Sequence, residues 1–220
     1  MLGGGNIFPL YLYPDITKED LFSGSASGEK EPNIAPEIFE KLKVVFKKEV
    51  TPEQIFYYIY AVLYSNTYRT KYAEFLKIDF PRIPFTKDYK LFIKLGELGK
   101  ELADLHLLKS SKLNKPITKF PVDGSSEVEK VNYESVGTSR DLSLHGIVYI
   151  NKEQYFEPVP EEVWNYHIGG YQVCHKWLKD RKGRKLTLEE RETYCKIVTA
   201  LHHTIELQKQ IDELYDGVEG

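Results

Sequence analysis

The sequence has few of the residues that mark a secreted or disulfide-stabilised protein. It contains 2 cysteines, Cys174 and Cys195, among 220 residues, which is too few for a disulfide framework and favours a reducing cytoplasm. No apolar run approaches the roughly 18 residues that a membrane-spanning helix needs, and no signal-peptide pattern opens the chain. The sequence therefore predicts a cytoplasmic protein with no membrane partner.

The sequence also lacks the common catalytic motifs. It has no G-x-x-x-x-G-K-[ST] phosphate loop, no G-x-G-x-x-G nucleotide fingerprint, and no Asn-Pro-Pro-Tyr tetrapeptide of the kind that amino-methyltransferases carry. Residues 88–90 and 180–182 have the Asp-x-Lys form found in some nucleases, but neither has a suitably spaced acidic partner. We therefore expect no catalytic residue in this chain.

A zinc site could be imagined from Cys174, His175, Cys195, His202 and His203, but their spacing fits no structural zinc pattern. Each cysteine is better explained as a small apolar residue that packs in a helix. A hydrolase with a Cys–His nucleophile would need a third group to orient the base, and the sequence marks none. We predict no metal ligand and give the hydrolase the least weight of three functional readings.

The bulk composition is that of an ordinary globular protein, with 41% hydrophobic and 29% charged residues. A chain of this length can form one sizeable core, alone or with a smaller satellite. The net charge of -3 argues against a simple cationic nucleic-acid binder but allows local positive charge. The 16 tyrosines suit surfaces that are half packed and half wet, either binding surfaces or the edge of a core.

The pattern predicts an α+β fold that is mostly helical, with a small antiparallel sheet from the middle of the chain. After a short apolar strand near residues 6–16 and a polar loop at 17–33, a helical part covers 34–108. Thr51 and Pro52 mark one helix start. Helices are expected at 54–64, 67–76 and 88–108, and the prolines in 79–84 require extended backbone.

The sheet is expected within residues 110–158, with strands near 117–122, 131–136 and 146–150. Turns are expected at 123–124 and 151–152, and Pro158 and Pro160 would close the sheet. A C-terminal helical part covers 160–215, with helices at 164–168 and 171–179. A last helix is capped by Thr187 and Glu190, which form a capping box.

The strongest functional signal is a basic segment at residues 176–185, which contains six basic residues and one acid. Such a density of positive charge attracts phosphates, although basic residues also suit the solvated end of a helix. The basic residues of this segment are Lys176, Lys179, Arg181, Lys182, Arg184 and Lys185.

Two further sets complete the candidate DNA-binding residues. Gly169 and Gly170 precede a predicted helix, where they could let an anion approach the free amides; the alternative is a turn that needs positive φ. Arg69, Lys71 and Arg82 could contact a phosphate or a base, or they could be ordinary surface and ion-paired residues.

Three stretches together resemble one family. Residues 51–84 read TPEQIFYYIYAVLYSNTYRTKYAEFLKIDFPRIP, residues 96–108 read GELGKELADLHLL, and residues 163–184 read VWNYHIGGYQVCHKWLKDRKGR, followed later by HHTIELQKQID. In this order and at these separations they resemble the C-terminal specificity domain of the Type ISP restriction–modification enzymes. The likeness extends from about Phe8 to Asp212 and is weakest at 110–155.

The resemblance implies a target-recognition domain at residues 17–220, preceded by a tail at 1–16 from an upstream methyltransferase domain of the same polypeptide. The glycine-rich start at 1–5 is read as the lead into a fragment. The parent would be a restriction enzyme and DNA adenine methyltransferase that uses S-adenosylmethionine, ATP and Mg, whereas this part would need no cofactor.

We therefore expect sequence-specific recognition of double-stranded DNA, with phosphate contacts from the candidate residues above and base contacts in or near 110–155. The rival is a protein-interaction module that docks the methyltransferase or motor domain without reading DNA, which the negative net charge would favour. A continuous positive strip that joins Arg69, Arg82 and residues 176–185 would favour the DNA reader.

Overall fold

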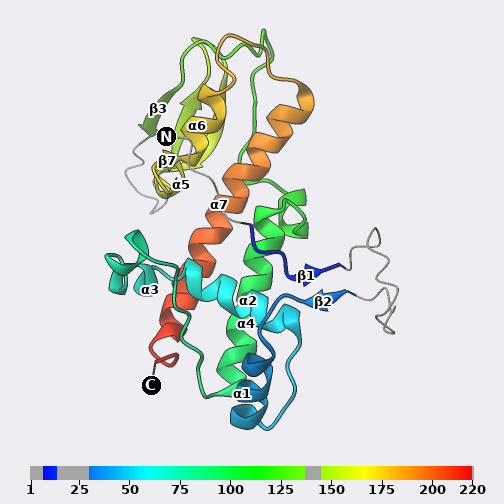
Figure 1. Cartoon of the computed structure of the whole chain (residues 1–220). Helices are drawn as coiled ribbons and strands as arrows, with labels where there is room; N and C mark the ends of the chain where they lie inside the picture. Colours follow the sequence, from blue (N-terminus) through cyan, green and yellow to red (C-terminus); the bar gives the residue numbers. More distant parts are fainter. Residues whose placement is uncertain (1–6, 14–29, 137–144, 220) are drawn as a thin grey trace. The chain divides into compact units, whose positions relative to one another are not determined.

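The computed structural model describes residues 7–13, 30–136 and 145–219. It divides into two compact units, of which unit 1 comprises residues 1–100 and 214–220, and unit 2 comprises residues 101–213. Most of the predicted loop at 17–33, and parts of the predicted tail and sheet regions, lie outside the described residues. Figure 1 colours the elements along the chain.

Unit 1 is built from helices whose starts the sequence marks clearly. Helix α1 (Pro36–Phe46) begins at a proline, and α2 (Pro52–Tyr64) is capped by Thr51, which forms a capping box with Gln54. The backbone NH of Gln54 donates to Thr51 Oγ1 at 3.2 Å, and the NH of Thr51 donates to Gln54 Oε1 at 2.9 Å. The helix start predicted at Thr51 and Pro52 is confirmed.

The rest of unit 1 is less regular. A two-residue strand β1 (Tyr11–Leu12) pairs antiparallel with β2 (Glu31–Pro32). The helix predicted at 67–76 is wrong in length, because α3 (Asn66–Lys71) ends early and only a 3-10 turn, η1 (Phe75–Lys77), follows. Two threonines within these few residues lower the helix propensity, and a helix this short gains little stability of its own.

Two buried tyrosines hold the predicted extended segment of unit 1. Tyr58 stacks on Phe85 and Phe92, with ring centroids 5.2 and 4.9 Å away, and its hydroxyl donates to the Pro84 carbonyl at 2.8 Å. Tyr68 donates to the Arg82 carbonyl at 3.0 Å. Of the two explanations offered for the tyrosines, a binding surface or the edge of a core, the second is confirmed for Tyr58 and Tyr68.

Helix α4 (Tyr89–His106) continues from unit 1 into unit 2. It approaches α2 closely at Gly99, where an added Cβ would lie 1.9 Å from the Tyr57 carbonyl oxygen. Only glycine fits at this crossing. The helix agrees with the one predicted at 88–108 to within a residue or two at each end.

Unit 2 contains a three-stranded antiparallel sheet in the order β3 (Asn132–Val136), β4 (His145–Tyr149) and β5 (Tyr155–Pro160). The strand predicted at 117–122 is wrong: it makes only an isolated bridge between Lys119 and Glu157. The two prolines expected to close the sheet, Pro158 and Pro160, instead belong to β5. Because β5 is an edge strand, their missing NH groups need not pair with a neighbour.

Helices cover the rest of unit 2. They are the 3-10 turn η2 (Ser111–Asn114), α5 (Glu161–Trp164), α6 (Val173–Lys179) and α7 (Leu188–Tyr215), which continues into unit 1. Between α5 and α6 a hairpin, β6 (His167–Ile168) and β7 (Tyr171–Gln172), replaces parts of two predicted helices. Within the described residues, no helix is both long enough and apolar enough to span a bilayer.

The core of unit 2 lies between the sheet, α6 and α7. Its fully buried side chains include Phe156 from β5, Leu178 from α6, and Tyr194 and Val198 from α7. The rings of Phe156 and Tyr194 lie 4.3 Å apart. This packing fixes α6 and the residues that follow it. The α+β class, mostly helical with a small antiparallel sheet, is confirmed.

Candidate nucleic-acid interface

The basic segment 176–185 begins in α6 and continues through a tight turn. Gly183 has a φ of 79°, and its NH donates to the Val128 carbonyl at 2.8 Å. The NH of Val128 donates in return to the Arg184 carbonyl at 3.1 Å, and the NH of Leu186 donates to the Ser126 carbonyl at 2.8 Å. The segment is therefore anchored to unit 2 by its backbone, so its side chains project from a fixed support.

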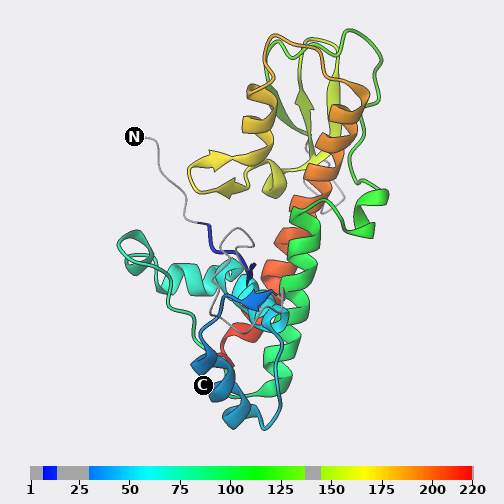
Figure 2. The ribbon, with the colours of Figure 1, turned by 45° about the vertical axis from the view of Figure 1, so that its right-hand side comes forward.

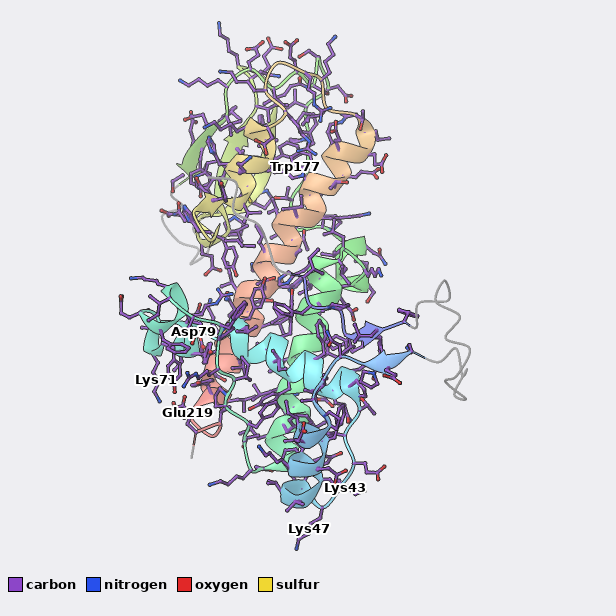
Figure 3. All side chains as sticks on the ribbon, viewed as in Figure 1. Lys43, Lys47, Lys71, Asp79, Trp177 and Glu219 are labelled. Carbon is purple, nitrogen blue, oxygen red and sulfur yellow. The ribbon has the colours of Figure 1, made fainter. Side chains whose placement is uncertain are left out.

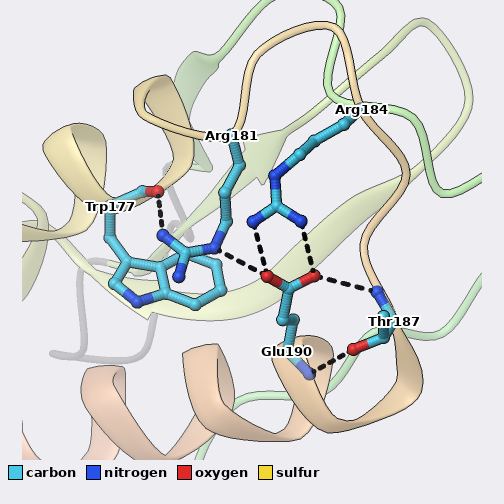
Figure 4. Close-up of polar contacts among 5 residues, drawn as sticks. All are labelled: Trp177, Arg181, Arg184, Thr187 and Glu190. Carbon is cyan, nitrogen blue, oxygen red and sulfur yellow. Dashed lines mark hydrogen bonds and ion pairs between the residues drawn. The ribbon is translucent and has the colours of Figure 1, made fainter.

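Both arginines of the segment bind one carboxylate (Figure 4). Arg181 Nε donates to Glu190 Oε1 at 3.1 Å, and Arg184 Nη2 donates to the same oxygen at 2.6 Å. Glu190 also closes the predicted capping box with Thr187: its Oε2 accepts from the Thr187 NH, and its own NH donates to Thr187 Oγ1, both at 3.1 Å. The capping box is confirmed. The Glu190 carboxylate also binds both arginines, which the sequence did not predict.

Arg181 also contacts Trp177, in two ways. The centre of its guanidinium lies 3.4 Å from the indole centroid, and its Nη1 donates to the Trp177 carbonyl at 2.9 Å. We call Trp177, Arg181, Arg184, Thr187 and Glu190 the Glu190 cluster. The Thr187 NH, followed by the two arginines, lowers the pKa of Glu190.

The lysines of the segment are placed differently. Lys176 pairs with Asp180, with Nζ 2.6 Å from Oδ1. Lys179, Lys182 and Lys185 are exposed, and none of them forms an ion pair within the described part of the chain. These three lysines are therefore the predicted phosphate-contacting cations of unit 2 that have no carboxylate partner among the described residues.

Gly169 and Gly170 do not lie directly before the helix. They form the turn of the β6–β7 hairpin, and β7 separates them from α6. Gly169 has a φ of 57°, and a Cβ on either glycine would meet no atom within 4 Å. The interpretation as a helix start that admits an anion is wrong; the alternative, a turn with positive φ, is confirmed. Their role as DNA contacts stays a prediction.

A shallow hollow of about 410 Å³ lies between this hairpin and α6. The exposed fraction of Tyr171 beside it is 63%, and that of Ile168 is 50%. Lys176 Nζ lies 5.7 Å from the centroid of the Tyr171 ring. The residues that line the hollow are His167, Gly170, Tyr171, Gln172, His175, Lys176, Lys179 and Asp180.

Sequence reasoning reached the glycines and lysines of this surface but missed His167, Ile168 and Tyr171. The available signal was the string HIGGY, in which two glycines separate two short stretches that each contain an apolar side chain. This pattern is typical of a tight hairpin. We call His167, Ile168, Tyr171, Lys176 and Lys179 the hairpin surface.

The candidate residues of unit 1 have their own neighbours. Arg69 Nε donates to the Leu63 carbonyl at 2.6 Å. Lys71 pairs with Glu219, as Figure 3 shows, and this interaction is the largest cause of the lowered pKa of Glu219. The side chain of Arg82 is 82% exposed and lies 3.9 Å from Asp79. Arg82 is therefore more exposed than Lys71, whose side chain is 53% exposed.

The predicted positive strip would join Arg69 and Arg82 of unit 1 to residues 176–185 of unit 2. Because the two sets belong to different units, the continuous strip stays a prediction. Within unit 2 alone, three cations of the segment bind a carboxylate, namely Arg181, Arg184 and Lys176. The other three, Lys179, Lys182 and Lys185, are exposed and have no ion pair among the described residues.

The two cysteines pack in the core of unit 2, as expected. Burial raises the pKa of the Cys174 thiol to about 12 and that of Cys195 to about 11. Thiols with such values are almost entirely protonated at neutral pH and are poor nucleophiles. The interpretation of both as small apolar packing residues is confirmed.

One group of three potential metal ligands occurs in the described residues, and it differs from the set considered in the sequence. It consists of His202, His203 and Glu206 on α7. His203 Nδ1 lies 2.8 Å from Glu206 Oε2, and His202 Nε2 lies 3.5 Å from Glu206 Oε1. The carboxylate already pairs with both rings. Glu206 was missed, although its position three and four residues after the histidines places it beside them on a helix.

The two Asp-x-Lys tripeptides have local structural roles. Asp88 Oδ1 accepts from the Lys90 NH at 2.7 Å at the start of α4, which is the usual role of an aspartate at a helix N-terminus. Asp180 binds Lys176 at the end of α6.

Comparison with known proteins gives one family. The family model described as the Type ISP C-terminal specificity domain matches residues 1–210. No curated protein matches the sequence. Solved structures with a similar fold include a nuclease-deletion mutant of the Type ISP restriction-modification enzyme LlaGI with a DNA substrate mimic (24% identity, TM-score 0.53). They also include the ATP-dependent Type ISP enzyme LlaBIII bound to DNA (24%, 0.57) and a DrdV–DNA complex (19%, 0.65).

These structures are of much longer chains. The similarity covers 74%, 96% and 93% of this chain, but only 14%, 13% and 21% of LlaGI, LlaBIII and DrdV respectively. The chain therefore spans less than a quarter of each of these three proteins, and at these identities the likeness concerns the fold.

Proposed function

The chain belongs to the family of Type ISP C-terminal specificity domains, and from this premise we propose that it recognises a DNA sequence for a restriction–modification enzyme. The match of the family model over residues 1–210 is the observation that carries the proposal. The three similar structures named above are all complexes with DNA or a DNA mimic. A specificity domain contributes binding, and the chemistry belongs to other parts of the enzyme.

The charge distribution of unit 2 supports a role in DNA binding. Lys179, Lys182 and Lys185 place positive charge on a surface of a chain whose net charge is -3. Lysines in this situation gain from phosphate contacts through the release of counterions. Such contacts position a protein on the duplex, whereas base contacts specify the sequence.

We further propose that the parent is an adenine methyltransferase and nuclease that uses S-adenosylmethionine, ATP and Mg, and that it acts in the cytoplasm. The family to which the chain belongs supports this, because a specificity domain would recognise the target and upstream domains would bind the cofactors. The described residues supply no nucleotide-binding motif of their own.

An exposed apolar surface in unit 1 suits a neighbouring methyltransferase domain. Phe8 and Phe80 are 69% and 61% exposed, and their rings contact edge to face at 5.8 Å. The neighbouring Ile7 and Ile78 are exposed by 90% and 83%. Apolar side chains left so open gain from burial against a partner, and residues 1–16 would join the chain to that domain.

The test of the proposal is an exchange of residues 1–220 between the parent enzyme and a relative that methylates a different site. Sequencing that detects methylated adenines would map the sites before and after the exchange. We expect the methylated site to follow the exchanged chain. If the site stays with the rest of the enzyme, the chain does not recognise the target.

The rival function, a module that docks other domains without reading DNA, predicts the opposite result. In that case the exchanged enzyme would keep its original site and change only in rate or assembly. The family match favours the DNA reader over this rival.

A further inference from the structure

The β6–β7 hairpin is an outlying arm of unit 2. Figure 2 shows it, in yellow, projecting away from the three-stranded sheet. Its turn, Gly169–Gly170, has open space around it, and the side chains on either side of the turn, Ile168 and Tyr171, are at least half exposed. Exposed apolar side chains at the end of a short arm suggest that the arm contacts a ligand.

Although the arm is short, hydrogen bonds brace its base. The NH of Val173 donates to the Tyr166 carbonyl at 3.1 Å, and Gln172 Nε2 donates to the Trp164 carbonyl at 2.5 Å. The Trp164 ring is itself stacked on Tyr133 of β3, with centroids 5.1 Å apart and ring planes 7° from parallel. The arm is thus connected to the sheet, so the two side chains at its end are presented from a fixed support.

His167 adds a polar group with a defined orientation. Its Nδ1 lies 2.7 Å from the Asn165 carbonyl oxygen. Because a carbonyl only accepts, Nδ1 carries the hydrogen. In the neutral ring Nε2 is then an acceptor, and it has no partner among the described residues. Such an acceptor can receive a hydrogen bond from the exocyclic amine of adenine or cytosine.

Positive charge accompanies the arm. Lys176 and Lys179 of α6 line the hollow beside it, and the single carboxylate there, Asp180, pairs with Lys176. A protein partner would favour a broader apolar area with less charge at its centre. Two apolar side chains and an acceptor, flanked by lysines, suit the edges of bases between two phosphate backbones.

We propose that the β6–β7 hairpin enters the major groove of the target DNA and reads part of the recognition site. A two-stranded ribbon fits this groove. Ile168 and Tyr171 contact base edges, His167 Nε2 accepts from a base, and Lys176 and Lys179 lie toward the flanking phosphates. The inference rests on the proposed function and assigns base readout to a segment outside residues 110–155.

The experiment uses the complete parent enzyme and two duplexes, one with the methylated site mapped above and one with the same bases scrambled. The variant combines Ile168→Thr and Tyr171→Thr, because threonine keeps the strand propensity and removes the larger apolar surface. The control is Leu107→Ala, which changes a residue of unit 2 that is 62% exposed. Fluorescence anisotropy gives the affinity for each duplex, and circular dichroism checks the fold.

We expect the ratio of target to scrambled affinity to fall about tenfold in the hairpin variant, as for the loss of a base contact. Affinity for the scrambled duplex should stay within about twofold, and the control should match the wild type. An unchanged ratio in a folded variant would overturn the inference. So would an unchanged ratio together with slower methylation at saturating DNA, because the hairpin would then contact protein.

A second variant, His167→Ala, keeps the test decisive if the double variant does not fold. Removal of the acceptor should lower the same affinity ratio, by less than the double variant does, and an unchanged ratio would count against the hairpin. Failure of the proposed function is distinguishable: exchange of residues 1–220 would then leave the methylated site in place. If that exchange moves the site while both hairpin variants keep the ratio, only the present inference fails.

Discussion

The Glu190 cluster and the hairpin surface both include residues of α6, and both contain basic and aromatic side chains. In the Glu190 cluster each charged group has a partner: Arg181 and Arg184 bind Glu190, and Arg181 also lies on Trp177. At the hairpin surface Tyr171 is largely exposed and Lys179 has no ion pair within the described residues. The first region stabilises unit 2, whereas the second is available to a ligand.

The difference follows from the two kinds of basic side chain. Arginine presents a planar fork that can bind a carboxylate and stack on an aromatic ring at once, whereas lysine is a flexible point charge that stays hydrated. The density of positive charge in residues 176–185 therefore overstates what the segment offers to DNA. Because Arg181 and Arg184 bind Glu190 and Lys176 binds Asp180, the cations left for DNA are Lys179, Lys182 and Lys185.

The largest effect on stability is expected for Glu190→Ala. The substitution removes the capping box and leaves two arginines without their carboxylate, so we expect the free energy of unfolding to fall by about 2 kcal/mol. Urea denaturation would measure it. Glu189→Ala, at the exposed neighbouring position, should cost less than about 0.5 kcal/mol. Equal losses from the two substitutions would show that Glu190 has no special role.

A smaller effect is expected for the contact between Arg181 and Trp177. A double-mutant cycle of Trp177→Leu and Arg181→Gln should give a coupling energy of about 1 kcal/mol, as for a partly buried cation–π pair. The matched cycle of Trp177→Leu with Arg184→Gln should give a coupling near zero, because among the described residues Arg181, and not Arg184, forms a cation–π pair with the indole. Similar couplings in the two cycles would contradict the geometry.

The smallest expected effect is the pH dependence of the stability that Glu190 contributes. The pKa of Glu190 is lowered in the folded chain, first by the Thr187 NH and then by the arginines. Its contribution to stability is therefore complete above the unfolded pKa of about 4.3 and is lost as the pH falls through the folded value. The difference in unfolding free energy between the wild type and Glu190→Gln should be constant near neutral pH and shrink in acid. A difference that grows in acid would contradict this assignment.

The sequence predicted features that depend on a few neighbouring residues. The caps at Thr51 and Thr187 and the extended backbone at 79–84 are examples. Capping residues and prolines act on the backbone within one turn, so their effects can be read from the sequence alone. The mostly helical α+β class followed from the same local signals.

Features that depend on distant residues could not be predicted in this way. Strand β5 contains Pro158 and Pro160 and is possible only because it lies at a sheet edge. The strands of the β6–β7 hairpin have two residues each, which is too short for a periodic pattern. The pairing of Arg181 and Arg184 with Glu190 depends on how the start of α7 lies beside them. The sequence therefore predicted six available cations where three of the six have a carboxylate partner.

The most direct test of the distinction between arginines that bind Glu190 and lysines that are available to DNA is the salt dependence of DNA binding by the parent enzyme. One variant replaces Lys179, Lys182 and Lys185 with glutamine, and the other replaces Arg181 and Arg184, with the fold of each checked by circular dichroism. Each lost phosphate contact lowers the slope of log affinity against log salt by about 0.9. We predict a decrease of between 2 and 3, roughly, for the lysine variant and less than about 1 for the arginine variant. The reverse order would contradict the account.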